Sequence, residues 1–197
     1  MRKIGVTAAA FVAALAIGLP AAADPSPAGG ANNVVIATST ASATLSQRSG
    51  VQIAIDAAPT AASGNLAVAN ASDCTGCRSV AVALQAVLVT GSPSTFVPAN
   101  VATAVNSDCT GCTSYAYANQ YVVQTSGPVH LTPTGLAEIS ALRSEADAVA
   151  SSDESPDELT TDLDALAAQL KAVIDSQLVA AGVAATANAR RDVQTAG

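Results

Sequence analysis

Four cysteines are the residues of this chain whose type and spacing most clearly suggest chemistry. They form two C-x-x-C pairs, because the hexapeptide SDCTGC begins at Ser72 and recurs unchanged 35 residues later, at Ser107. Two such pairs can form disulfides, hold a tetrahedral zinc ion or carry out thiol–disulfide exchange. The residues concerned are Cys74, Cys77, Cys109 and Cys112.

The start of the chain favours the disulfide interpretation. Residues 1–23 read as a secretory signal peptide, with Arg2 and Lys3 ahead of an apolar stretch and three alanines before Asp24. Exported proteins keep disulfides, and an even number of cysteines fits this. Pairing within each C-x-x-C is favoured by proximity. Pairing between the copies closes a longer loop and so restricts the unfolded chain more, and that alternative stays open.

Zinc and redox chemistry are the other two interpretations of the cysteines. An oxidising compartment competes with zinc for the thiols, and the two pairs are further apart than in a compact zinc ribbon. A redox thiol needs a lowered pKa, but Asp73 and Asp108 precede the first cysteine of each pair and raise it. Arg78 offsets this in the first copy, whereas Thr113 takes its place in the second.

Other candidate residues carry weaker signals. Tyr115, Tyr117 and Tyr121, the only tyrosines, fall on one face of one strand, where they either bind a partner or pack beneath other elements. His130 is the only histidine and has no nucleophile motif near it, and the acidic cluster between residues 153 and 158 lacks a calcium-loop pattern. No catalytic constellation is present, so we expect a non-enzyme without a cofactor.

The repeat indicates how these residues are positioned. Its copies span about residues 65–90 and 100–125, and identical residues recur at every second position after the cysteines. That period is typical of strands, so each copy is expected to be a strand, a C-T-G-C turn and a strand. A further hairpin is expected within residues 34–55. Together with a flexible leader at 24–33, these segments define a β domain over residues 34–126.

Helical periodicity takes over in residues 131–181. Thr132-Pro133 reads as a helix start, and Ser155 to Glu158 reads as a capping box followed by a leucine stripe. The prediction is a helical hairpin, followed by a disordered tail at 182–197. The fold class is therefore α+β: an Ala/Val-rich antiparallel sheet or small sandwich with a duplicated strand–CTGC–strand unit and a C-terminal helical hairpin.

The doubled C-T-G-C, with its N-x-A-x-A lead and A-x-A-x-Q-x-V continuation, resembles an uncharacterised group of actinobacterial secreted proteins. The similarity covers roughly residues 65–178, including the run G-P-V-H-L-T-P-x-G at 127–135. Members are sometimes labelled as peptide zinc metalloproteases, but no position here matches a metal-binding catalytic motif. The resemblance therefore implies export and paired cysteines, and no activity.

Charge excludes some partners. The net charge is −7, and two of the eight basic residues lie in the signal peptide, so nucleic acid and anionic membrane surfaces are disfavoured. No segment after the signal peptide is long and apolar enough for stable membrane insertion. The expected function is a secreted, non-catalytic envelope or extracellular module, stabilised by disulfides, that engages an unknown protein or envelope partner. The alternatives are an extracytoplasmic thiol–disulfide protein and a zinc-stabilised binding module.

Overall fold

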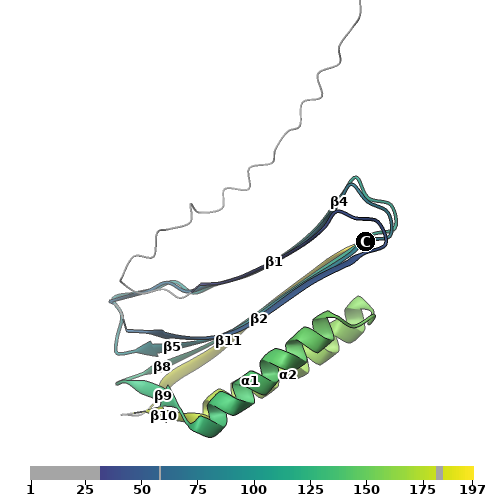
Figure 1. Cartoon of the computed structure of the whole chain (residues 1–197). Coiled ribbons are helices and arrows are strands. Elements are labelled where there is room, and N and C mark those ends of the chain that lie inside the picture. Colours follow the sequence, from purple (N-terminus) through teal and green to yellow (C-terminus); the bar gives the residue numbers. More distant parts are fainter. Residues whose placement is uncertain (1–31, 58, 181–183) are drawn as a thin grey trace, which may run out of the picture.

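The computed structural model describes residues 32–57, 59–180 and 184–197. The expected signal peptide (1–23) and most of the expected leader (24–33) lie outside the described residues. The remainder forms three layers: two β-sheets face each other, and two helices cover the outer face of one sheet (Figure 1). An α+β fold with a C-terminal helical hairpin is confirmed.

Both large sheets are built from equivalent strands of successive repeats. Sheet A contains three parallel strands in the order β1 (Asn33–Ser39), β4 (Gly64–Ser72) and β7 (Ala99–Ser107). Sheet B contains the parallel strands β2 (Leu45–Asp56), β5 (Arg78–Thr90) and β8 (Thr113–Thr125), with β11 (Ala184–Ala196) antiparallel beside β8. The short strands β3 (Thr60–Ala61) and β6 (Thr95–Phe96) pair in parallel where the chain returns to sheet A.

The chain thus winds as a solenoid of three coils. Each coil runs along sheet A, turns a corner and runs back along sheet B; the first two then return through β3 or β6. The expected antiparallel pairing within residues 34–55 and within each copy is wrong, because the two strands of a unit lie in different sheets. The C-T-G-C segment is a corner between sheets, and each strand pairs with its equivalent in the next coil.

Stacking in register explains why identical residues recur at every second position. The recurring residues face the space between the sheets, where buried alanines such as Ala69, Ala83 and Ala118 allow close approach. Polar positions also repeat there, and two of them form ladders. Asn33 Nδ2 donates to Asn65 Oδ1 (3.0 Å), and Asn65 Nδ2 donates to Asn100 Oδ1 (2.7 Å). A second ladder joins Gln120, Gln85 and Gln52 at 2.8 and 3.0 Å.

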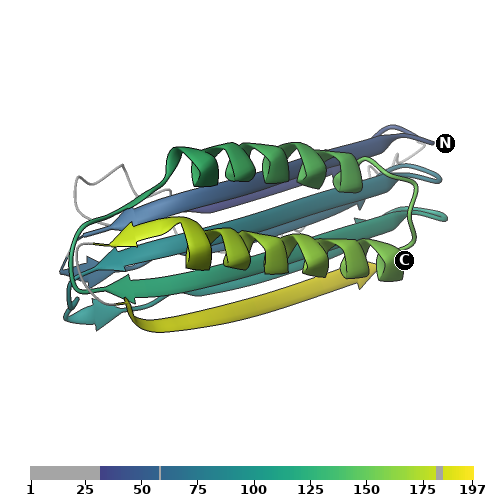
Figure 2. The same cartoon turned by 90° about the horizontal axis from the view of Figure 1, so that it is seen from below.

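The helices begin where the sequence indicates. The Thr132 side chain caps α1 (Pro133–Ala150), and a complete capping box formed by Ser155 and Glu158 starts α2 (Pro156–Gln177). Both lie on the outer face of sheet B and run roughly along its strands (Figure 2). The leucine stripe of α2 is buried against the bulky outward residues of β5 and β8. Short antiparallel strands β9 (Val129–Leu131) and β10 (Leu178–Ala180) join the two ends of the hairpin.

The expected disordered tail is instead β11, apart from residues 182 and 183, which lie outside the described residues. It pairs with β8 from Ala184 to Ala196. Its side chains also reach β7: Asp192 Oδ2 accepts from Ala102 N (2.9 Å) and Gln194 Oε1 accepts from Ala104 N (3.4 Å). β11 therefore caps the third coil, supplying partners to strands of both sheets. The segment is polar and has no helical periodicity, which agrees with its position as the edge strand of sheet B.

Candidate functional site

The two C-T-G-C corners lie on top of each other at one end of the solenoid. Thr75 and Thr110 form a parallel bridge, and the backbone hydrogen bonds Gly76 N to Thr110 O (2.9 Å) and Thr110 N to Cys74 O (3.2 Å) lock the corners together. Gly76 and Gly111 have positive φ values, 63° and 64°, which glycine adopts without strain. The repeated hexapeptide therefore places its cysteines in two equivalent, stacked positions.

All four cysteines lie at these stacked corners, and the sulfurs of Cys74, Cys109 and Cys112 are within 4.8 Å of one another. Cys74 and Cys77 form a disulfide, whereas Cys109 and Cys112 are free thiols. Cys74 Sγ lies 3.4 Å from Cys109 Sγ and 3.9 Å from Cys112 Sγ. Cys74, Cys77 and Cys112 are buried, and Cys109 is half-buried. The expected disulfide is confirmed for Cys74–Cys77; the second bond expected between Cys109 and Cys112 is not formed. We call these four residues the sulfur cluster.

The electrostatics of the sulfur cluster disfavour a reactive thiolate. Partial burial and the hydrogen bond with Cys112 raise the pKa of the Cys109 thiol, and Asp73 raises it further. Arg78 extends to the loop between the helices, where its Nη1 donates to Ser152 O (2.7 Å) and its Nη2 to Glu154 O (2.5 Å). A cysteine with a raised pKa is a poor nucleophile at neutral pH.

The tyrosines singled out as possible partner-binding residues are instead part of the core. Tyr115, Tyr117 and Tyr121 are buried beneath α2, so they offer no accessible surface to a partner. Each hydroxyl reaches a polar group of α2: Tyr115 Oη lies 2.9 Å from Thr160 Oγ1, Tyr117 Oη donates to Asp164 Oδ1 (2.8 Å), and Tyr121 Oη to Asp175 Oδ1 (2.5 Å). The alternative of packing under the helices therefore describes them.

This burial predicts alkaline unfolding. Burial raises the pKa of Tyr115 to about 12, and burial with the neighbouring carboxylates raises the pKa of Tyr117 and Tyr121 above its ordinary value. The folded state therefore holds protons that the unfolded chain releases near pH 10. Below about pH 10 the tyrosines are protonated in both states, so they add no pH dependence to the free energy of unfolding. As pH rises from about 10 to about 12, the free energy of unfolding should fall.

Ultraviolet absorbance of phenolate, followed together with near-ultraviolet circular dichroism, measures this effect. The chain has three tyrosines and all are buried, so no exposed phenol contributes. We expect phenolate to appear together with loss of the dichroism signal. Ionisation near pH 10 in a chain that keeps its tertiary signal would contradict the packing of these rings.

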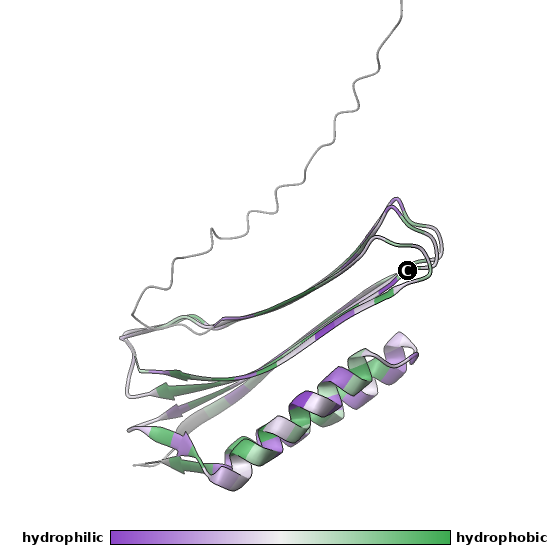
Figure 3. Ribbon diagram, viewed as in Figure 1, coloured by the Kyte–Doolittle hydropathy of each residue, from purple (hydrophilic) through white to green (hydrophobic). Residues whose placement is uncertain are grey.

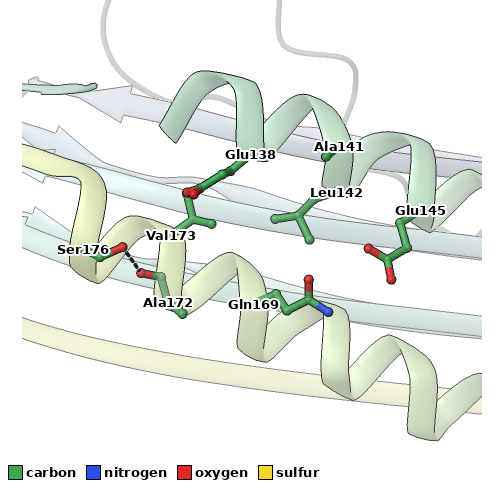
Figure 4. A pocket seen from close by; sticks show the side chains of 8 residues that line it. All are labelled: Glu138, Ala141, Leu142, Glu145, Gln169, Ala172, Val173 and Ser176. Atoms are coloured by element: carbon green, nitrogen blue, oxygen red, sulfur yellow. Dashed lines mark hydrogen bonds between the residues drawn. The ribbon is translucent and has the colours of Figure 1, made fainter. Parts of the chain in front are cut away.

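Two other features do not assemble into a site. His130 is exposed on β9. A shallow groove between the helices is lined by Glu138, Leu142 and Glu145 of α1 and by Val173 of α2 (Figure 4). These acids lie seven residues apart on α1, and the other residues that line the groove are alanines, Leu142, Val173, Gln169 and Ser176. The groove is a seam between two packed helices.

The outer face of sheet A is a candidate contact surface that sequence reasoning missed. Val34, Ile36, Val101 and Val105 are exposed there, beside the half-buried Leu66 and Val68. The middle of the sheet is strongly hydrophobic and lies on the side away from the helices (Figure 3). β1, β4 and β7 contain no charged residue. The alternation of these segments predicted strands, but did not indicate that their second face stays uncovered.

Sequence reasoning also did not recognise residues 33–56 as a first copy of the repeat. Its sequence has diverged from the other two, but one spacing persists. The inward asparagine and glutamine are 20 residues apart in the second and third coils (Asn65 to Gln85, Asn100 to Gln120) and 19 apart in the first (Asn33 to Gln52). This spacing could have revealed a third repeat.

The described part of the chain is thus a three-coil parallel β-solenoid with a helical hairpin on one sheet and a sulfur cluster at one corner. No protein-family model, no curated protein and no solved structure matches this chain. Among the described residues, no helix combines the length and hydrophobicity needed to cross a membrane.

Proposed function

We propose that the protein is a secreted, non-catalytic structural module of the cell exterior that associates with a second copy of itself through strand β1. The main support is that, within the described residues, one end of the solenoid is covered by an additional strand and the other end is not. At the third coil, β11 pairs with β8 and supplies acceptors to β7. At the first coil, β1 pairs with β4 on one side, and the described residues place no strand on its other side.

β1 lacks the features that keep edge strands apart. Natural edges are protected by lysines, prolines, bulges or covering segments. β1 reads NVVIATS, without charge or proline, and pairs with β4 in continuous register. Val34 and Ile36 point outward and are 56% and 49% exposed. An edge with these properties favours pairing with another strand. The end strand of sheet B on the same side, β2, differs because a side chain of α1 reaches it: Arg143 Nε donates to Val51 O (3.0 Å).

A second copy fits this edge by symmetry. Two identical strands related by a two-fold axis pair antiparallel, and such closed pairing is the commonest form of self-association. Ile36 is the middle residue of β1, so the symmetric register places Ile36 beside Ile36 of the second copy. The two A sheets would join into one continuous sheet of six strands, with one uncharged outer face. The net negative charge resides elsewhere and opposes further non-specific association.

The experiment measures the mass in solution of the chain beginning at Asp24, by analytical ultracentrifugation over a range of concentrations. We expect a dimer. Ile36→Lys places two like charges opposite each other at the two-fold axis and should weaken dimerisation at least about tenfold, or about 1.4 kcal/mol. Val105→Lys is the matched control, since it puts the same charge on the same outer face at β7 and should leave the dimer intact.

A monomer at all concentrations would overturn the proposal, because it would mean that β1 remains unpaired or is covered within one chain. Equal weakening by Ile36→Lys and Val105→Lys would overturn the edge-to-edge arrangement, since it would locate the contact on the sheet face. Circular dichroism of both variants shows whether the solenoid is retained, and only a folded variant counts in the comparison.

A further inference from the structure

We propose that the sulfur cluster, when its disulfide is reduced, binds one thiophilic divalent metal ion such as Zn²⁺ through Cys74, Cys77, Cys109 and Cys112. This inference concerns the corner of the solenoid and does not depend on self-association through β1. Its basis is that two stacked corners place three cysteine sulfurs from two different coils within 4.8 Å of one another, with Cys77 bonded to one of them.

The spacing of the sulfurs matches a tetrahedral thiolate site. Zinc–sulfur bonds are about 2.3 Å long, so the sulfurs of a regular tetrahedron lie about 3.8 Å apart. The two distances between the coils, from Cys74 Sγ to Cys109 Sγ and to Cys112 Sγ, are 3.4 and 3.9 Å. The sulfurs of Cys74, Cys109 and Cys112 all lie within 4.8 Å of one another. Cys77 Sγ is bonded to Cys74 Sγ and lies 3.3 Å from Ala41 O of the first coil, outside this group of three, so it has to turn toward the other sulfurs to become the fourth ligand.

The backbone holds the ligands in place. Hydrogen bonds between the corners continue on both sides of the cysteines, from Asp73 N to Ser107 O (3.2 Å) and from Thr113 N to Cys77 O (2.9 Å). Asp73 and Asp108 adopt positive φ values, so the entry to both corners has the same backbone conformation. Two C-x-x-C pairs in equivalent conformations, stacked one coil apart, bring three sulfurs together and place the fourth, on Cys77, beside Cys74. A metal ion there would bridge the second and third coils, which the Cys74–Cys77 bond does not do.

The disulfide makes this site conditional on redox state. A dithiol reductant would transfer two electrons and two protons to the Cys74–Cys77 bond and become a disulfide itself, leaving two protein thiols. Metal binding would then replace four S–H bonds with four sulfur–metal bonds and release four protons. In the oxidised state two of the four sulfurs bond to each other, and the set of thiolate ligands is incomplete.

The test is a titration of the mature chain with Co²⁺, a spectroscopic substitute for Zn²⁺, after reduction by a dithiol and its removal without oxygen. We expect one equivalent of Co²⁺ to bind with the absorption of a tetrahedral four-thiolate centre, and Zn²⁺ to displace it. Cys109→Ser should weaken Co²⁺ binding at least about tenfold and lower the sulfur-to-metal absorption. Thr110→Ser, in the same corner, should bind as the parent chain does.

The near-ultraviolet dichroism of the buried tyrosines is recorded in the same samples, because the proposal requires the folded solenoid. Absence of stoichiometric Co²⁺ binding by the reduced, folded chain would overturn it. So would binding by a chain that has lost the tyrosine signal, or equal binding by Cys109→Ser. Unreduced protein should leave Co²⁺ unbound, and tetrahedral binding there would show that the Cys74–Cys77 bond does not control the site.

Discussion

Removal of β11, by ending the chain at residue 183, is expected to convert a protein of defined size into large, heterogeneous assemblies. The deletion exposes the edge of β8 from Ser114 to Thr125, which β11 otherwise covers. It also removes the acceptors that Asp192 and Gln194 give to Ala102 N and Ala104 N of β7. With both ends of the solenoid open, nothing limits association to two copies.

Light scattering and analytical ultracentrifugation detect these assemblies, and far-ultraviolet circular dichroism shows whether they retain the sheet. Deletion of Gly197 alone is the control, since this residue follows β11 and should leave the size unchanged. A truncated chain that stays folded, and has the same mass as the full chain, would show that β11 does not act as a cap.

Asn65→Ala is expected to lower the free energy of unfolding by about 3 kcal/mol. Asn65 is buried, and its Nδ2 donates to Ala83 O (2.9 Å), Asn119 O (3.1 Å) and Asn100 Oδ1 (2.7 Å). Its Oδ1 also accepts from Asn33. Alanine removes one hydrogen-bond partner from each of these groups between two closely packed sheets, although Asn33 Nδ2 still donates to Gly50 O and Leu84 O. Each lost partner of a buried polar group costs about 1–3 kcal/mol. That is a large part of the 5–15 kcal/mol that typically stabilises a domain.

Urea denaturation followed by circular dichroism measures this change. The control is Asn70→Ala, which removes the same side chain from the same strand but from its half-buried outer face. We expect the control to change stability by less than about 0.5 kcal/mol. Similar losses in the two variants would mean that the asparagine ladder adds nothing beyond the general effect of losing an asparagine on β4.

The helical hairpin could be predicted from sequence because its signals are local. Thr132 and Ser155 cap helices from positions adjacent to them, and the leucines of α2 recur with the helical period. The same holds for the alternation in the repeats and for the C-T-G-C turns. Each of these follows from interactions between residues close together in the chain.

The partners of the strands could not be predicted in this way. A strand followed by a tight turn and another strand fits both a hairpin and a corner of a solenoid, and the alternation of side chains is the same in both. What separates them is whether Asn65 meets Asn100 from the next coil, which is a contact across 35 residues. The role of β11 was hidden for the same reason, since its polar residues acquire partners only at the exposed end of the third coil.

For the candidate sites too, the sequence indicated which residues matter, and the fold decided what surrounds them. The hexapeptide at Ser72 and Ser107 already implied that four cysteines matter. It did not indicate that Cys74 Sγ would lie 3.4 Å from Cys109 Sγ of the next coil. Tyr115, Tyr117 and Tyr121 were correctly placed on one face of a strand, and the covering helix decided that this face is core.

Sequence alone determined the two helices, the strands of the duplicated segment and the presence of two cysteine pairs, because periodicity, capping and residue type act over a few residues. The tertiary structure alone decided which strands pair, which faces are covered and which end is left open. Those outcomes depend on contacts between residues tens of positions apart, whose free energy is gained only once the coils have stacked.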